Sequence, residues 1–258
     1  MDTIDNNLRE INSLNQRGGR MLTIVDLVDD GTLDPPTAGY LLACARAGAS
    51  FLSAAGPGGV GKSTLMACLL SFLPPGERIM TVTDPDAVGT GDGPTCYLCH
   101  EIGAGSWFGY LWGEKAARFL ALHRHGRIAA SLHADTDAEI RDQLLGPGVG
   151  ADEGDLAAVD LLLTMVREGG RRRVLTIYEA TDDARPAWQP TVAWNRREDS
   201  FSMQSGQLLP RLSGPAEAQA QIEAGTEFIG GLVTDDVRLL EDVLEAVADF
   251  YDSEGTPP

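Results

Sequence analysis

The chain has 258 residues, 43% of them hydrophobic and 22% charged, which is enough for one α/β domain with a well-filled core. Its formal net charge is −18, and such a surface excludes nucleic acid as a partner, because binding DNA or RNA requires lysine and arginine side chains that neutralise phosphates. No run of about 18 apolar residues occurs, so no segment is expected to insert into a membrane.

The amino terminus is polar and acidic. Residues 1–7 lack the charged-then-apolar pattern of a secretion signal, which favours a cytoplasmic location. Gly18 and Gly19, near the end of the polar stretch 1–20, predict a flexible arm over 1–20. Lys62 and Lys115 are the only lysines in the chain. A halophilic source and an arginine-rich codon bias would both produce this composition, and the two explanations stay open.

Strands and helices alternate through the next part of the chain. Short apolar runs predict strands at 50–54, 78–83, 95–100 and 127–132. Helices are predicted at 35–46, 62–72, 107–125 and 135–145. This alternation indicates a parallel central sheet with helices on both faces.

The pattern changes after this alternating part. Residues 159–167 and 173–180, separated by a Glu-Gly-Gly turn, predict an antiparallel β-hairpin. Further short strands are predicted at 191–194 and 201–203, and apolar spacing from Pro215 onward predicts two terminal helices. We therefore expect a main α/β domain over 21–213 and a C-terminal helical segment over 214–258.

A glycine-rich stretch between the first strand and the following helix is the strongest motif. Its residues are Gly56, Pro57, Gly58, Gly59, Val60, Gly61, Lys62 and Ser63. The glycines allow backbone amides to converge on phosphate oxygens, and the helix start adds its positive end. Lys62 is expected to bind the β- and γ-phosphates of ATP, Ser63 to bind Mg²⁺, and Thr64 to help cap the helix. The alternative is a glycine-rich turn of another kind, but the strand-loop-helix context favours a nucleotide.

An ATPase with this loop also needs an acid and a γ-phosphate sensor at the neighbouring strand ends. Glu101 directly follows the strand at 95–100 and is the first candidate to orient water and help hold Mg²⁺. Asp84 and Asp86 close the preceding strand and are second candidates, and the alternative for all three is an ordinary exposed carboxylate. His133 follows the strand at 127–132, where a sensor would lie, although a lone histidine is more often structural.

The chain has four cysteines, Cys44, Cys68, Cys96 and Cys99. The segment from Cys96 to His100 matches a covalent haem-attachment pattern. However, it lies on a predicted buried strand, where residues three apart point to opposite faces. We therefore expect buried thiols and neither haem nor a metal at this segment.

Several segments, in the same order, resemble the ATPases that drive type II and type IV secretion and assemble type IV pili, especially their archaeal, archaellum-type branch. Residues 22–34 are similar to the lead-in to that branch's phosphate loop, and Tyr97 to Glu101 to its Walker B segment. The family's histidine box is resembled by Ser131, Leu132, His133, Ala134, Asp135 and Thr136. The arginine-rich hairpin ending at Glu179 and the strand with Ala193, Trp194 and Asn195 also fit, so the likeness spans about residues 20–252.

The resemblance implies a RecA-like P-loop NTPase fold with a parallel central sheet, a C-terminal β-hairpin region and terminal helices. It also implies ATP hydrolysis with Mg²⁺ and a homo-oligomer, with a hexameric ring as the form to test. The implied partner is a membrane platform protein or a full-size motor ATPase, which would hold the chain at the inner face of the membrane without inserting it.

Two departures from the family define the alternative. About twenty residues precede the similar region, so we expect a reduced form that lacks the family's amino-terminal clamp domain. The arginine-bearing segment before the Walker B glutamate is also missing here. A nucleotide-gated regulatory module with little or no hydrolysis is therefore the second hypothesis. Arginines that could complete the charge around the γ-phosphate, or simply offset an acidic surface, are Arg9, Arg17, Arg20, Arg171, Arg172 and Arg173.

Overall fold

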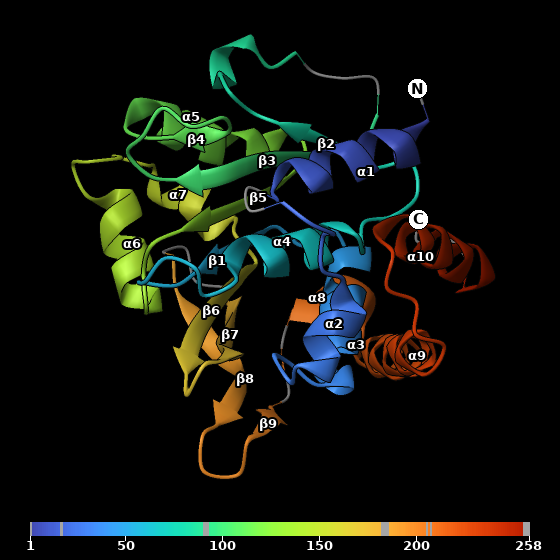
Figure 1. Ribbon diagram of the computed structural model, residues 1–258. Coiled ribbons are helices and arrows are strands. Elements are labelled where there is room, and N and C mark those ends of the chain that lie inside the picture. The colour runs from blue at the N-terminus through green and yellow to red at the C-terminus, as the bar shows by residue number, and fades with distance from the viewer. Residues whose placement is uncertain are drawn as a thin grey trace.

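The computed structural model describes residues 2–15, 18–89, 93–181, 186–204, 206 and 208–254, with only the backbone described at 211–213. Within these residues, a nine-stranded sheet has the order β2-β3-β5-β1-β6-β7-β8-β9, and β4 pairs with β3 (Figure 1). The strands are β1 (Phe51–Ala54), β2 (Arg78–Thr81), β3 (Thr95–Ile102), β4 (Tyr110–Leu111), β5 (Arg127–Leu132), β6 (Leu161–Glu168), β7 (Arg171–Ala180), β8 (Trp188–Asn195) and β9 (Ser200–Met203).

The sheet has a parallel half and an antiparallel half. The strands from β2 to β6 run parallel, with Phe51 in register with Ala129 on β5 and Leu161 on β6. The strands from β6 to β9 run antiparallel. The predicted α/β class, the parallel central sheet and the antiparallel hairpin are therefore confirmed. The central strands β1 and β5 are buried along their whole length, as expected for a sheet covered on both faces.

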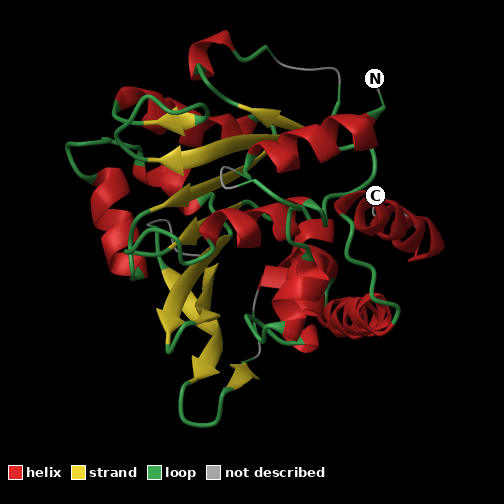
Figure 2. Cartoon of the chain, viewed as in Figure 1, coloured by secondary structure: helices red, strands yellow, loops and turns green. Residues whose placement is uncertain are grey.

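Helices cover both faces of the sheet, as Figure 2 shows. They are α1 (Thr3–Ser13), α2 (Ile24–Asp29), α3 (Pro35–Arg46), α4 (Lys62–Leu70), α5 (Glu114–Leu120), α6 (Asp137–Leu145), α7 (Glu153–Ala157), α8 (Leu208–Ser213), α9 (Pro215–Thr234) and α10 (Leu240–Glu254). Alternate residues of β3 belong to two separate apolar cores, with Cys96 in one and Cys99 in the other. All four thiols are buried, as predicted, and burial raises the pKa of each of them.

The amino-terminal segment differs from the expected flexible arm. Residues 3–13 form helix α1, which begins after the capping residue Asp2 and packs along the edge strand β2. Ile11 is fully buried in the core, and Ile4 and Leu8 pack against that core from the same helix face. The polar composition concealed this spacing of three and four residues, which is the signature of an amphipathic helix. Arg17 lies outside the described residues.

A second difference concerns the helix predicted over 107–125. Residues 110–111 form strand β4, α5 begins only at Glu114, and a 3₁₀ turn follows at Ala121–Arg124. Gly109 and Gly113 have φ values of +74° and +62°, and this left-handed backbone interrupts a helix. As a result, Trp107 and Phe108 lie on an exposed loop.

The two predicted terminal helices are present as α9 and α10. Helix α9 packs closely along α3, where a Cβ on Gly39 would lie 2.4 Å from the backbone nitrogen of Thr226. Helices α2, α7 and α8 were not predicted. In the part of the chain that the structure describes, no helix is both long and apolar enough to cross a bilayer.

Candidate functional site

The phosphate loop connects the end of β1 to the first turn of α4. Gly59 and Gly61 have φ values of +78° and +119°, which favour glycine, and Gly61 is the N-cap of α4. Lys62 is the first residue of this nine-residue helix. The phosphate loop therefore leads directly into the amino-terminal end of a helix, where anions bind.

A cavity of about 480 Å³ lies over this loop, a size suited to a small-molecule ligand. The loop and α4 line it with Gly58, Gly59, Gly61, Lys62, Ser63 and Thr64. The strand ends and the hairpin add Glu101, Tyr110, His133 and Arg172. A third set, which we call the amino-terminal wall, consists of Leu14, Asn15, Gly18, Arg20, Met21 and Leu22. Val60, another residue of the loop, is buried and does not line the cavity.

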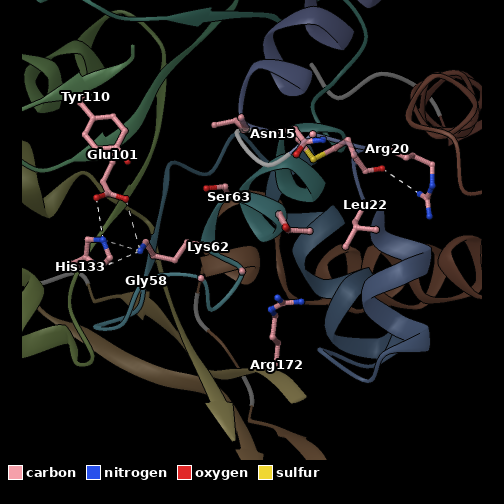
Figure 3. A pocket seen from close by; sticks show the side chains of 16 residues that line it. Asn15, Arg20, Leu22, Gly58, Lys62, Ser63, Glu101, Tyr110, His133 and Arg172 are labelled. Atoms are coloured by element: carbon pink, nitrogen blue, oxygen red, sulfur yellow. Dashed lines mark hydrogen bonds and ion pairs between the residues drawn. The ribbon is translucent and has the colours of Figure 1, made fainter. Parts of the chain in front are cut away.

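Three residues predicted from separate segments converge at one end of the cavity, and we call them the sheet wall (Figure 3). The Lys62 Nζ atom lies 3.9 Å from Glu101 Oε2 and 3.3 Å from His133 Nδ1. Glu101 Oε1 lies 3.1 Å from His133 Nε2. The Lys62 side chain is buried, and this burial lowers its pKa, while the charge of Glu101 acts in the opposite direction.

His133 also contacts the phosphate loop itself. Its Nδ1 lies 2.8 Å from the carbonyl oxygen of Gly56 and 3.1 Å from that of Ala55. A ring with the proton on Nδ1 donates to these carbonyl groups. The histidine therefore links the phosphate loop to Glu101.

Asp135 forms a further link between the histidine segment and the loop. Its Oδ1 accepts a hydrogen bond of 2.7 Å from the Gly56 amide. A Cβ on Gly56 would lie 2.3 Å from Asp135 Oδ2, so any larger residue there would displace the Asp135 carboxylate. From the sequence, Asp135 was expected to begin a helix and to belong to the resembled histidine box, and no contact with the phosphate loop was predicted for it.

The second candidates for the catalytic acid lie elsewhere. Asp84 pairs with Lys115 at 3.4 Å, and Asp86 pairs with Arg118. Neither aspartate lines the cavity. Of the three proposed acids, the structure brings Glu101 alone to Lys62.

The site offers oxygen ligands that fit Mg²⁺. The Ser63 hydroxyl and the Glu101 carboxylate both line the cavity. Among the described residues, no group of three or more His, Cys, Asp or Glu side chains could hold a metal ion by itself. One hydroxyl and one carboxylate suit Mg²⁺, which keeps several waters and is commonly held together with substrate phosphates.

The amino-terminal wall is held by contacts at both of its ends. His100, next to Glu101 on β3, lies 3.3 Å from Ser13 Oγ and 3.3 Å from Thr81 Oγ1. Burial lowers the pKa of His100 to about 4. At the other end, Arg20 binds both carboxylate oxygens of Asp26 at 2.8 Å. Sequence reasoning missed this wall because it treated residues 1–20 as flexible.

Comparison with protein-family models and with curated protein sequences finds no match. Among solved structures, the chain is similar to the crystal structure of the VirB11 ATPase from the Brucella suis type IV secretion system in complex with sulphate. The TM-score is 0.38 and the sequence identity is 15%. The match covers 66% of this chain and 55% of that chain, so it spans just over half of the neighbour's length.

Proposed function

We propose that this chain binds Mg²⁺-ATP and hydrolyses it as a motor ATPase of the type II/IV secretion and type IV pilus class. The observation that carries the proposal is the convergence of Lys62, Glu101 and His133 on one cavity over a phosphate loop. The order of the segments along the chain, which resembles that class, supports the assignment to a motor.

In the proposed mechanism, the loop amides and Lys62 hold the β- and γ-phosphates. Ser63 would hold Mg²⁺, which neutralises charge on the phosphates as the phosphoryl group transfers. Glu101 orients a water molecule and takes its proton as the water oxygen bonds to the γ-phosphorus. The bond between that phosphorus and the bridging oxygen breaks, and ADP leaves with the electron pair. His133 senses the γ-phosphate.

The contacts of Lys62 suggest how binding and catalysis are connected. Its ammonium group lies 3.9 Å from Glu101 Oε2 and next to the His133 ring. When Lys62 moves onto phosphate oxygens, Glu101 Oε2 loses this neighbour and becomes free to accept a hydrogen bond from a water molecule. Binding of the triphosphate would then prepare Glu101 for catalysis. Until Lys62 has moved from Glu101 to the phosphates, hydrolysis would be slow.

The assembly is part of the same proposal. We infer a homo-oligomer, with a hexameric ring as the form to test, that acts in the cytoplasm at the inner face of the membrane. A membrane platform protein or a full-size motor ATPase would be its partner. Mass measurement with and without Mg²⁺-ATP tests the oligomer directly.

A nucleotide-gated regulatory module is the second candidate. The observation in its favour is that both oxygens of Glu101 are engaged, one with His133 and the other with Lys62. A carboxylate whose two oxygens already have protein partners is less available to orient a water molecule. Under this hypothesis the chain binds ATP and changes shape, but its turnover is negligible.

Turnover of the Glu101→Gln variant under saturating Mg²⁺-ATP separates the two. For an ATPase, the variant keeps its affinity for ATP and loses turnover by about 100-fold or more, because the water is no longer positioned by a base. Asp84→Asn is the matched control, since that carboxylate lies outside the cavity. An unchanged rate in Glu101→Gln contradicts the assigned role, and a wild type that binds ATP without turnover favours the regulatory module.

A further inference from the structure

The tip of the β6–β7 hairpin carries three consecutive arginines with different surroundings. Arg171 and Arg173 project to the same side, and both bind Asp199, with Arg173 Nε at 2.9 Å. Arg173 is buried and also donates to the carbonyl oxygen of Asp30. Arg172 lies between them on the opposite face of the strand, because side chains alternate along a strand.

The Arg172 side chain lies against the phosphate loop. A Cβ added to Gly61 would lie 3.1 Å from Arg172 Cδ and 3.8 Å from its Nε. Its Nε atom is shielded from solvent and has no hydrogen-bond partner. Unlike Arg171 and Arg173, Arg172 forms no ion pair with the described residues. Arg20, the other arginine that lines the cavity, is instead neutralised by Asp26.

Arg172 and the sheet wall lie on different sides of the loop. Glu101 lies on β3 and His133 directly follows β5, and both strands lie on one side of β1 in the sheet. Arg172 comes from β7, on the other side, beyond β6. Figure 3 shows Lys62, Glu101 and His133 joined by dashed lines, with Arg172 apart from them at the other side of the loop.

We propose that Arg172 binds the α- and β-phosphates of a nucleoside di- or triphosphate from within the same chain. The proposal rests on the proposed function and adds a second cationic end to its site. A buried Nε atom without a hydrogen-bond partner is costly, and phosphate oxygens would satisfy it with a charge-assisted hydrogen bond. Because the sheet wall occupies the γ-phosphate end, Arg172 serves the phosphates that ADP and ATP share.

Binding of Mg²⁺-ADP and Mg²⁺-ATP to Arg172→Ala and Arg172→Lys, measured by calorimetry, tests this assignment. We expect Arg172→Ala to weaken both ligands by about 10-fold or more, and to a similar extent, because each loses a charge-assisted contact. Arg172→Lys should recover part of the affinity. Arg171→Ala is the matched control on the same hairpin, since Arg171 pairs with Asp199, and it should bind both nucleotides like the wild type.

Thermal unfolding without nucleotide checks that the fold is intact. Arg172→Ala should unfold at the wild-type temperature or above it, because the arginine has no partner to lose, yet it should gain less stability from added ADP. Wild-type affinity for ADP in Arg172→Ala would overturn the proposal, whether or not turnover falls. If the wild type binds neither nucleotide, the proposed function itself fails. If binding depends on Lys62 and not on Arg172, only this inference fails.

Discussion

The sheet wall and the amino-terminal wall face the same cavity but are built in different ways. The sheet wall places polar side chains at strand and helix ends, where Lys62, Glu101 and His133 contact one another. The amino-terminal wall is a connecting segment whose position depends on the packing of α1 and on contacts made by His100 and Asp26. Substitutions in the sheet wall should therefore change the affinity for the ligand. Substitutions of residues that hold the amino-terminal wall in place should mainly change the free energy of unfolding.

Lys62→Ala, in the sheet wall, should have the largest effect of any single substitution at the cavity. Removing the ammonium group should weaken Mg²⁺-ATP binding by at least about 100-fold, because several charge-assisted contacts to phosphate are lost together. Calorimetry measures this loss, and circular dichroism should show an intact fold because Lys62 belongs to neither apolar core. Lys115→Ala is the matched control, since the other lysine pairs with Asp84 outside the cavity. Wild-type affinity in Lys62→Ala would remove the phosphate-loop assignment.

Ile11→Ala tests the amino-terminal wall, whose position depends on the packing of α1. This side chain is fully buried, so we expect a loss of about 2–4 kcal/mol in the free energy of unfolding. Urea unfolding measures the loss, and the exposed Arg9→Ala on the same helix should change stability by less than about 0.5 kcal/mol. A wild-type unfolding curve for Ile11→Ala would restore the flexible-arm expectation, under which removing residues 1–20 leaves stability almost unchanged.

His100 connects the two walls and should make stability depend on pH. The unfolded histidine takes up a proton near pH 6.5, whereas the folded one does so only at about 4. Its stabilising contribution is therefore full above pH 6.5 and is lost as the pH falls from 6.5 to about 4. The loss should be at most about 3 kcal/mol, the equivalent of this pKa difference.

Urea unfolding of wild type and His100→Gln at pH 7 and pH 4.5 measures this effect. The variant should lose less stability between the two pH values than the wild type. The nearby Glu10 partly opposes the shift, and Asp26, with a pKa of about 2, stays charged over this range. Parallel losses in the two proteins would show that His100 does not titrate as described.

Much of the parallel half and the sheet wall was predictable because the signals are local. A buried strand such as β1 is a short apolar run, and a phosphate loop is a fixed spacing of glycines before Lys62. Strand-end residues such as Glu101 and His133 meet because the carboxyl ends of parallel strands share one edge of the sheet. The roles assigned to these residues, and the domain boundaries, stay predictions.

The amino-terminal wall could not be predicted in the same way. Its lining by Leu14, Met21 and Leu22 depends on where α1 packs, and Ile4, Leu8 and Ile11 gave a weak signal among many polar residues. The contact of Arg172 with Gly61 joins residues more than a hundred positions apart. The distinction between Asp84 and Glu101 likewise required the partner of each carboxylate, which sequence does not specify.

The contact between α1 and β2 has a consequence for the growth of the sheet. Asn7 donates to the carbonyl oxygen of Glu77 at 2.9 Å and accepts from the Ile79 amide at 2.8 Å, as a peptide group of an adjoining strand would. Asn6 and Glu10 engage the next outward-facing groups, the Ile79 carbonyl oxygen and the Thr81 amide. Three side chains of a helix thus imitate one more strand. An edge whose peptide groups are already occupied cannot recruit a strand from another molecule, so this border of the sheet is protected against self-templated aggregation.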